Sequence, residues 1–263
     1  MLEPGVTLHV YGIVGAVDPH LAERLGHFAG ALEDGGYTYL VFTAAKETQL
    51  PEAGIEPSYE ATLPYEQWLD GDISTPVFEA GLTIVPPWCS APQDAERVLH
   101  VEPSLVFGTG AHPTTRRCLR LIARLARSLH PPTTVLDLGC GTGLLGLAAL
   151  RQGAERVWAC DVCALAVEVA RSNARRNSLS DAVEIALAPA GSFARPADLV
   201  LANLPPSALD ELLDHPSLDH ARWVVASGML RSDMARLVER LTSSRHHIET
   251  FVDGCWHTAL ITC

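Results

Sequence analysis

Two short segments of the 263-residue chain have residue types that suit ligand binding: the first combines an acidic residue with glycines, and the second ends in an acidic residue. The first is Asp137–Gly143, Asp-Leu-Gly-Cys-Gly-Thr-Gly, which lies between two apolar runs. Its glycines, Gly139, Gly141 and Gly143, let the backbone turn sharply and let a ligand lie against it. The spacing is not that of the Gly-x-Gly-x-x-Gly dinucleotide fingerprint, because residue 144 is Leu.

The second segment ends in Asp161, 22 residues after Gly139. A carboxylate at this point can accept hydrogen bonds from both hydroxyls of a ribose, which a dinucleotide and an adenosylmethionine cofactor both offer. Asp137, which precedes the glycines within a predicted strand, resembles the adenosylmethionine-binding motif. We therefore predict S-adenosyl-L-methionine as the cofactor; the alternative is a structural turn without a ligand.

The segment Asn203-Leu204-Pro205-Pro206 follows another apolar run. In open α/β sheets, ligands bind at the carboxyl ends of the strands near the switch point. Asn203 has a side-chain acceptor there, and Leu204 offers a carbonyl that the prolines hold in place. Two converging acceptors suit an amine. The segment resembles the (Asn/Asp)-x-Pro-(aromatic) motif of methyltransferases that act on nitrogen, but Pro206 replaces the aromatic residue; a strand-ending Asn turn is the alternative.

The segment Val106–Thr115, VFGTGAHPTT, has two glycines that predict a mobile loop before a helix. Thr114 or Thr115 can cap or line the start of that helix. His112 has three possible roles: to orient an amine, to contact the carboxylate of the cofactor, or to cap the helix beside Pro113.

With this segment the chain resembles the PrmA family, the methyltransferases of protein eleven of the large ribosomal subunit. FGTGAHPTT matches the family hallmark FGTGxHPTT, and LDLGCGTG, Asp161 and Asn203 also match. IVPPW at 84–88, SGML at 227–230 and the Gly254-Cys255-Trp256 strand extend the resemblance over residues 65–263. The family usually has Asn-Ile-Leu where this chain has Asn203-Leu204-Pro205-Pro206, so the departure lies in the substrate pocket and not in the cofactor pocket.

The resemblance implies an adenosylmethionine-dependent protein N-methyltransferase that acts on lysine side chains, or on an α-amine, of a ribosomal protein. It implies catalytic roles for Asn203, Leu204 and His112. The cofactor contacts that we expect are Thr115, Gly139, Gly141, Gly143, Asp161 and Asn203. Two other functions stay open: methylation of an amine on RNA, DNA or a small molecule, and cofactor binding without turnover.

Strands and helices alternate in the second part of the chain, where these residues lie. The pattern predicts helices over 114–129, 144–152, 164–177, 207–213 and 231–242, and strands over 134–139, 156–161, 182–186, 198–202, 222–227, 247–253 and 255–262. Such alternation builds a mostly parallel sheet with helices on both faces, and the Asp253-Gly254 turn indicates an antiparallel hairpin at one edge. We expect an α/β fold, with a Rossmann-like, seven-stranded class I methyltransferase domain over 101–263.

The first part of the chain predicts a smaller α+β domain over 1–62. Its expected elements are a strand over 6–14, a helix over 19–32 that Gly35-Gly36 ends, and a strand over 37–45. Prolines, glycines and glutamates over 46–64 predict a loop or linker. Residues 63–100 are expected to connect the domains through a short helix over 65–69, a turn at Gly71 and strands over 81–85 and 97–101.

The net charge of −12 comes entirely from the first hundred residues, which carry 15 acidic and 3 basic side chains. Such a module repels nucleic acid and attracts a basic protein, although solubility alone explains the charge as well.

No apolar run is long enough to span a bilayer, and no signal peptide is recognisable, so we expect a cytoplasmic protein away from membranes. Its seven cysteines are then free thiols, and the single Cys160-x-x-Cys163 pair predicts no metal site. The oligomeric state is not encoded in any motif, and a monomer is the expectation.

Overall fold

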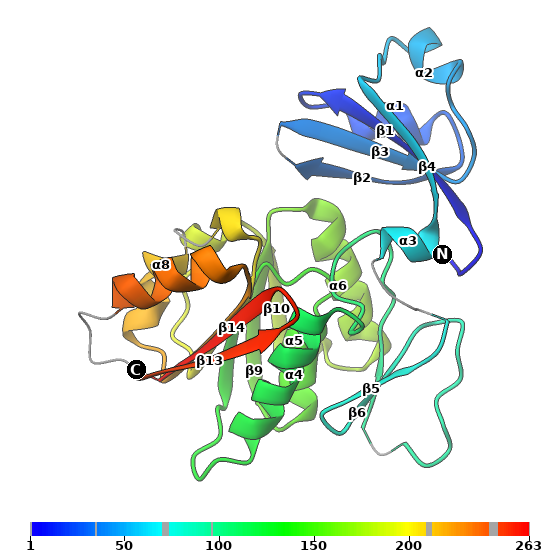
Figure 1. The fold of residues 1–263 in the computed structure, drawn as a ribbon. Coiled ribbons are helices and arrows are strands. Elements are labelled where there is room, and N and C mark those ends of the chain that lie inside the picture. The colour runs from blue at the N-terminus through cyan, green and yellow to red at the C-terminus, as the bar shows by residue number, and fades with distance from the viewer. Residues whose placement is uncertain are drawn as a thin grey trace. The chain divides into compact units, whose positions relative to one another are not determined.

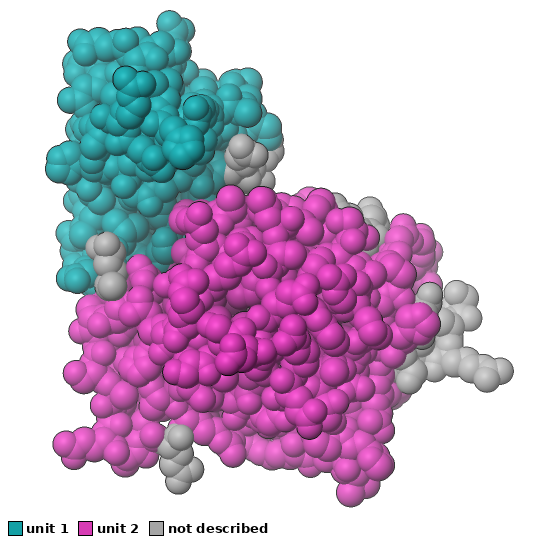
Figure 2. Space-filling view, turned by 180° about the vertical axis from the view of Figure 1, so that it is seen from behind, with its two compact units in different colours: residues 1–74, 104–106 teal, residues 75–103, 107–263 magenta. Residues whose placement is uncertain are grey.

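The computed structural model describes residues 2–34, 36–69, 74–95, 97–208, 212–241 and 247–262. It divides the chain into two compact units, coloured separately in Figure 2. Unit 1 contains residues 1–74 and 104–106, and unit 2 contains residues 75–103 and 107–263. The segment 63–100, expected to connect two domains, contributes ordered elements to both units.

Unit 1 is a four-stranded antiparallel sheet with short helices (Figure 1). The sheet order is β2-β3-β1-β4, so the first strand lies in the interior of the sheet. One face is packed by a cluster that includes Tyr11, Leu40 and Phe42. The elements are β1 (Thr7–Val14), α1 (Pro19–Glu23), β2 (Phe28–Asp34), β3 (Tyr37–Phe42), α2 (Gln49–Glu52), β4 (Tyr59–Pro64) and α3 (Tyr65–Trp68).

Two of our predictions for this region are wrong. The helix predicted over 19–32 ends at Glu23, because Gly26 and His27 both adopt a left-handed φ, and β2 then pairs with β3. Apolar residues at this spacing are therefore compatible with a strand as well as with a helix. Which of the two forms depends on whether a neighbouring strand is available for pairing. The loop predicted over 46–64 contains α2 and the strand β4, which pairs with β1. Its border residue Pro64 is compatible with a strand end. The turn predicted at Gly71 lies outside the described residues.

Lys46, the only lysine of the chain, is buried in unit 1 with 4% of its surface exposed. Its ammonium group donates a hydrogen bond to the carbonyl of Leu25 at 2.8 Å. The same nitrogen lies 5.9 Å from the centre of the Phe42 ring. Its position is therefore set by a backbone acceptor and an aromatic face.

Unit 2 begins with a small sheet in the order β5-β6-β7. It comprises β5 (Val77–Glu79), β6 (Leu82–Val85) and β7 (Val98–His100), of which the last two match predicted strands. Leu82, Ile84 and Leu99 of this sheet join the main core of the unit. The small sheet is thus part of the same folded body as the larger one.

The large sheet has seven strands, as expected, and their order is β10-β9-β8-β11-β12-β14-β13. All neighbours are parallel except β14, which is antiparallel to both β12 and β13. The chain runs outward from β8 in one direction and from β11 in the other, so the switch point lies between these two strands. The bounds are β8 (Thr134–Leu138), β9 (Arg156–Asp161), β10 (Val183–Leu187), β11 (Leu199–Asn203), β12 (Trp223–Met229), β13 (His247–Asp253) and β14 (Trp256–Thr262).

Helices cover both faces of this sheet (Figure 1). One core lies between β8 and three helices, α4 (Pro113–Ala126), α5 (Leu144–Arg151) and α6 (Ala164–Arg176). A second core on the other face contains side chains of α8 (Arg231–Leu241). Successive strand residues alternate between the two cores, as Val135 and Leu136 do. The helix predicted over 207–213 is only partly described, with a short 3-10 turn at Pro206–Ala208. No helix among the described residues is long and apolar enough to cross a membrane.

Candidate functional site at the carboxyl edge of the large sheet

The glycine loop, residues 139–143, connects β8 to α5. All three of its glycines have a left-handed φ, between +52° and +79°. At Gly141 a Cβ atom would also overlap the carbonyl oxygen of Phe107, so this position excludes every side chain. The sequence pattern is therefore explained by backbone conformation and by close packing of a second loop.

Asp161, at the end of β9, lies against the glycine loop. Its Oδ2 accepts a hydrogen bond from the Gly141 amide at 2.9 Å, and its Oδ1 accepts one from the Cys163 amide at 2.9 Å. A carboxylate has about four lone-pair positions, so these two bonds leave acceptor capacity on both oxygens. The structure thus brings Asp161 and the glycines together, as their positions after neighbouring strands predict.

The segment 107–112, which we call the FGTG loop, packs on the glycine loop. The Phe107 carbonyl accepts a hydrogen bond from the Thr142 amide at 3.0 Å. The Thr142 hydroxyl in turn donates to the Gly108 carbonyl at 2.7 Å. A Cβ on Gly108 would lie 2.7 Å from that hydroxyl oxygen. The two glycine-rich segments are therefore in close contact, and a side chain at Gly108 would disturb it.

His112 is the N-cap residue of α4. Its Nδ1 accepts a hydrogen bond from the Thr114 amide at 3.3 Å and lies 2.7 Å from the Thr114 hydroxyl. Its ring is edge-on to two aromatic rings, Phe107 and Trp256, each with centres 5.2 Å away. The capping role that the sequence left open is present, and a direct role of His112 in chemistry stays a prediction.

Asn203 and Leu204 end β11 beside Gly228 of β12. A Cβ on Gly228 would overlap the Leu204 carbonyl oxygen and would lie 3.4 Å from Oδ1 of Asn203. Both predicted acceptor oxygens therefore lie close to the Gly228 backbone, and only glycine leaves room for the Leu204 carbonyl there. On its other side, the Asn203 amide nitrogen lies 3.5 Å from the hydroxyl of Thr115, which is buried in the first turn of α4.

The Leu204 side chain joins this acceptor pair to the glycine loop. A Cβ on Gly139 would overlap Cδ2 of Leu204. The end of β11 and the loop after β8 are hence in van der Waals contact, on either side of the switch point. A ligand at the glycine loop and a group held by Asn203 and Leu204 would be neighbours.

Sequence reasoning missed two contributors. Gly228 was noted only within the SGML match, although a glycine at the end of a core strand signals a close backbone approach. Its φ is +86°, and the β12–β14 register shifts at this point. The ring row formed by Phe107, His112 and Trp256 joins segments more than 140 residues apart, and no local pattern reveals such a contact.

Asp137 proves to be structural as well as a motif residue. It is fully buried, and its Oδ2 accepts a hydrogen bond from the Gly146 amide at 3.0 Å. Burial raises the pKa of Asp137 to about 7, and the nearby charge of Asp161 adds to the rise. The hydrogen bond from Gly146 acts in the opposite direction.

A seven-stranded sheet of this order, with a glycine loop after its first strand and an acid after its second, defines the class I methyltransferase fold. The sequence profile described as "Ribosomal protein L11 methyltransferase (PrmA)" matches residues 67–262. The chain therefore belongs to the PrmA family.

Individual relatives agree with this assignment. The chain is 34% identical over 199 residues to a Ribosomal protein L11 methyltransferase of Gloeobacter violaceus, which covers 73% of this chain and 58% of the relative. The corresponding protein of Alteromonas mediterranea is 34% identical over 193 residues, or 72% of this chain and 64% of the relative. The chain thus spans about three fifths of the length of these relatives. A crystal structure of ribosomal protein L11 methylase from Lactobacillus delbrueckii superposes with a TM-score of 0.59 at 25% identity, covering 69% of this chain and 93% of that one.

The PrmA family uses S-adenosylmethionine as methyl donor, and the residues of this chain fit that cofactor. The glycine loop turns through three left-handed residues directly after β8, and Asp161 retains acceptor capacity for the two hydroxyls of a ribose. Thr115 and Asn203 stand at the other end of this edge, beside the acceptor pair. We expect Gly139, Gly141, Gly143 and Asp161 to hold the nucleoside part and Thr115 and Asn203 to lie near the methionine part.

The first prediction concerns Asp161. We expect Asp161→Ala to weaken adenosylmethionine binding by about 1.5–3 kcal/mol, because a charge-assisted acceptor for two hydroxyls is lost. Asp161→Asn keeps one acceptor oxygen and should lose less. Calorimetric titration measures both affinities, with thermal unfolding as the control for folding. Unchanged affinity in a folded Ala variant would remove Asp161 from the cofactor site.

A second prediction follows from the raised pKa of Asp137. The folded protein holds this proton up to about pH 7, whereas the unfolded chain releases it near pH 4, so stability falls as the pH rises between these values. Asp137→Asn removes this titration. Between pH 5.5 and pH 8 the wild type should lose about 2 kcal/mol of unfolding free energy relative to the variant. Urea denaturation at both pH values measures the difference, and a pH-independent difference would contradict the assignment.

Proposed function

We propose that the protein is an adenosylmethionine-dependent N-methyltransferase that methylates amino groups, above all lysine side chains, of a ribosomal protein. Membership of the PrmA family supports the reaction and the target. The observation that carries the proposal is that the Asn203 and Leu204 oxygens both lie near Gly228 at the carboxyl edge of the sheet, in contact with the glycine loop through the Leu204 side chain. A ribosomal-protein target also favours a cytoplasmic enzyme.

The chemistry requires a neutral amine. The cofactor, when bound, supplies an electrophilic methyl group on a sulfonium sulfur. At pH 7 a free lysine, with a pKa of about 10.4, is neutral in roughly one molecule in 2,500. A neighbouring positive charge and a desolvated site both disfavour the ammonium form and so increase the neutral fraction. An α-amine, with a pKa near 8, begins closer to neutrality and is therefore the second possible target.

The chain contributes orientation rather than a strong base. An amine that donates its two N–H groups to Oδ1 of Asn203 and the carbonyl of Leu204 has its lone pair directed away from both. The lone pair then faces the methyl donor, provided that the acceptors are fixed. Thr115 restrains the Asn203 amide, and the amide of Leu204 donates to the Ser227 carbonyl at 3.2 Å. Orientation of reacting groups is among the largest contributions to rate that a protein can make.

The experiment that tests this function is incubation of the protein with labelled adenosylmethionine and a cell lysate, with and without nuclease. A labelled band of ribosomal-protein size that resists nuclease supports the proposal. Nuclease-sensitive label would assign the activity to nucleic acid. That alternative is motivated by Asn203-Leu204-Pro205-Pro206, and the charge of −12 argues against it. Cofactor binding without any transfer would assign a role without turnover.

Unit 1 has properties that suit it to recruit a basic protein. Residues 1–74 carry 12 acidic and 2 basic side chains. The sheet face opposite α1 holds a groove of about 620 Å³, lined largely by apolar and aromatic side chains. Two of its lining side chains, Tyr39 and Tyr59, close over Gly12, where an added Cβ would lie 3.1–3.4 Å from them. We propose that this groove receives a lysine- or arginine-bearing segment of the target, because aromatic faces attract cations and the surrounding charge is negative.

Our third prediction is that Asn203→Ala lowers turnover far more than it weakens binding of the target protein. The amine loses its orientation, whereas the remote docking surface is unchanged. Steady-state kinetics on the methylated protein should show a fall in kcat with little change in KM. Near wild-type turnover in a folded variant would sink the amine-holding role of Asn203.

The fourth prediction tests the groove in the full chain. Tyr59 is 52% exposed, so Tyr59→Ala should fold normally but raise KM for the intact target about two- to tenfold, through loss of an aromatic face. Phe78→Ala is the matched control, since Phe78 is an aromatic residue of unit 2 that is also largely exposed, at 62%, and it should leave KM unchanged. Neither variant should alter activity on a short neutral peptide.

The same recruitment should depend on salt. KM for the intact target should rise between low and physiological ionic strength, where the screening length falls to about 8 Å, and KM for the neutral peptide should not. If Tyr59→Ala and salt both leave KM for the intact target unchanged, unit 1 does not recruit it and its charge serves solubility.

A further inference from the structure

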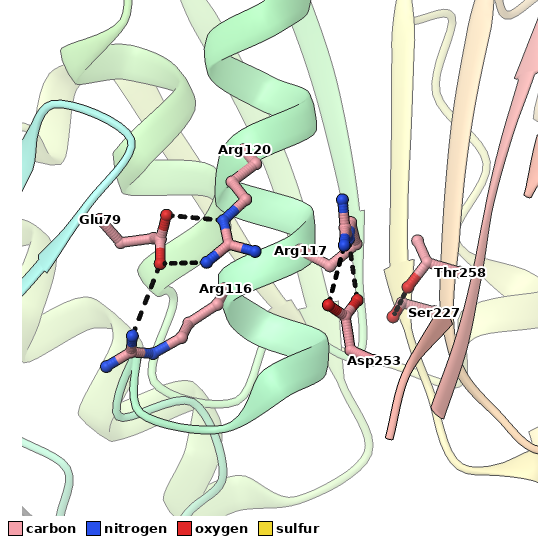
Figure 3. A network of polar contacts seen from close by, with 7 residues as sticks. All are labelled: Glu79, Arg116, Arg117, Arg120, Ser227, Asp253 and Thr258. Atoms are coloured by element: carbon pink, nitrogen blue, oxygen red, sulfur yellow. Dashed lines mark hydrogen bonds and ion pairs between the residues drawn. The ribbon is translucent and has the colours of Figure 1, made fainter. Parts of the chain in front are cut away.

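Arginines along α4 connect this helix to two different parts of unit 2. Arg120 binds Glu79 of β5 through two hydrogen bonds of 2.8 and 3.0 Å. Arg117 and Arg124 instead bind Asp253 and Glu249 of β13, each with two hydrogen bonds of 2.8 Å. Figure 3 shows the first of these contacts together with Arg117 and Asp253. The β13–β14 hairpin is therefore fixed to α4 at two points along its length.

The Arg117–Asp253 pair is the better enclosed of the two contacts with β13. Both side chains are 21% exposed, against 52% and 33% for Arg124 and Glu249. The Arg117 guanidinium also lies 4.9 Å from the centre of the Phe251 ring. Its hydrogen bonds hold the pKa of Asp253 below the usual value. A guanidinium that donates two parallel hydrogen bonds to a carboxylate fixes the relative orientation of the two side chains as well as their distance.

The two partners of this pair flank residues of the candidate site. Arg117 lies one helical turn after Thr114 and His112, the capped start of α4. Asp253 ends β13 directly opposite Trp256, with the turn at Gly254 between them. Fixing Asp253 on α4 therefore fixes the backbone of Trp256 relative to the first turn of the helix.

From Trp256 a continuous row of contacts leads to the glycine loop. The Trp256 indole is edge-on to His112, and His112 is edge-on to Phe107. The Phe107 carbonyl then accepts the hydrogen bond from Thr142 of the glycine loop. A shift of the hairpin tip would consequently reach the FGTG loop through three packed rings.

The other side of Trp256 is fixed by a buried hydroxyl pair. The Ser227 and Thr258 hydroxyl oxygens are 2.7 Å apart, and Ser227 precedes Gly228, where the Asn203 and Leu204 oxygens approach (Figure 3). Trp256 is thus held between an anchor at Thr258, toward the acceptor pair, and an anchor at Asp253, toward α4.

We propose that Arg117 and Asp253 are positioning residues for methyl transfer: their ion pair places Trp256 against His112 and so keeps the FGTG loop in register with the glycine loop. This inference rests on the proposed function. It assigns to the pair an effect on turnover that exceeds its contribution to stability. Partly exposed ion pairs typically contribute only about 0–1 kcal/mol to stability.

Arg124 and Glu249 provide a matched control. They join the same helix to the same strand, also through two hydrogen bonds, with Nη1 and Nη2 of Arg124 in place of Nε and Nη2 of Arg117, and they lie two helical turns further from His112. Arg117→Gln and Arg124→Gln should therefore lower thermal stability to a similar, small extent. Only Arg117→Gln should lower kcat on the target protein, about tenfold, with KM and adenosylmethionine affinity within threefold of wild type. Arg117→Lys keeps the positive charge but cannot make two parallel hydrogen bonds, so its kcat should lie between those of Arg117→Gln and the wild type.

A double variant tests whether the two residues act as a unit. Arg117→Gln with Asp253→Asn should fall no further in kcat than either single variant, because each already removes the same contact. A second readout does not depend on activity. In protein labelled with fluorotryptophan, the fluorine resonance of Trp256, assigned through Trp256→Phe, should shift in Arg117→Gln and not in Arg124→Gln.

The inference is overturned if Arg117→Gln leaves both kcat and the Trp256 resonance unchanged, or if Arg124→Gln lowers kcat as much. A shifted resonance in a protein that methylates no ribosomal target would leave the placement of Trp256 supported and would instead refute the proposed function.

Discussion

The position of Leu204 between two glycines is the constraint on which the site depends. Its carbonyl occupies space that a side chain on Gly228 would fill, and its own side chain occupies space that a side chain on Gly139 would fill. Gly228 is the second-last residue of β12 and Gly139 follows β8, and these strands are the two neighbours of β11 in the sheet. The carboxyl ends of three adjacent strands can therefore pack against Leu204 only because a glycine lies at the end of two of them. The acceptor pair and the glycine loop are adjacent for the same reason.

Much of this edge could be predicted from the sequence, because its residues follow strands directly. Strand ends are local features, and parallel strands bring them to one side of a sheet. This is why the sequence alone predicts that Gly141, Asp161 and Asn203 lie at one edge of the sheet, where the structure has them. The seven strands and the antiparallel hairpin at one edge agree with the prediction as well.

The contacts that were not predicted depend on tertiary pairing. β2 has apolar residues at helical spacing, and only its pairing with β3 makes it a strand. β4 is bordered by prolines and is polar enough to resemble a loop, yet β1 supplies its hydrogen bonds. The row of rings and the Arg117–Asp253 pair each join segments far apart in sequence. The spacing of apolar residues indicates which side of a segment is buried and whether its period suits a helix or a strand. It does not identify the segment that will pack or pair with it.

The burial of Lys46 affects how the chain reacts at its lysine amine. The only lysine amine of the protein is enclosed against a carbonyl and an aromatic ring in unit 1. Under the proposed lysine methylation, this chain would be a poor acceptor in its own reaction, whatever the origin of its arginine-rich composition. Methyl-lysine formed in that reaction would report on the added target, and amine-directed crosslinkers will find almost no lysine of this chain to capture.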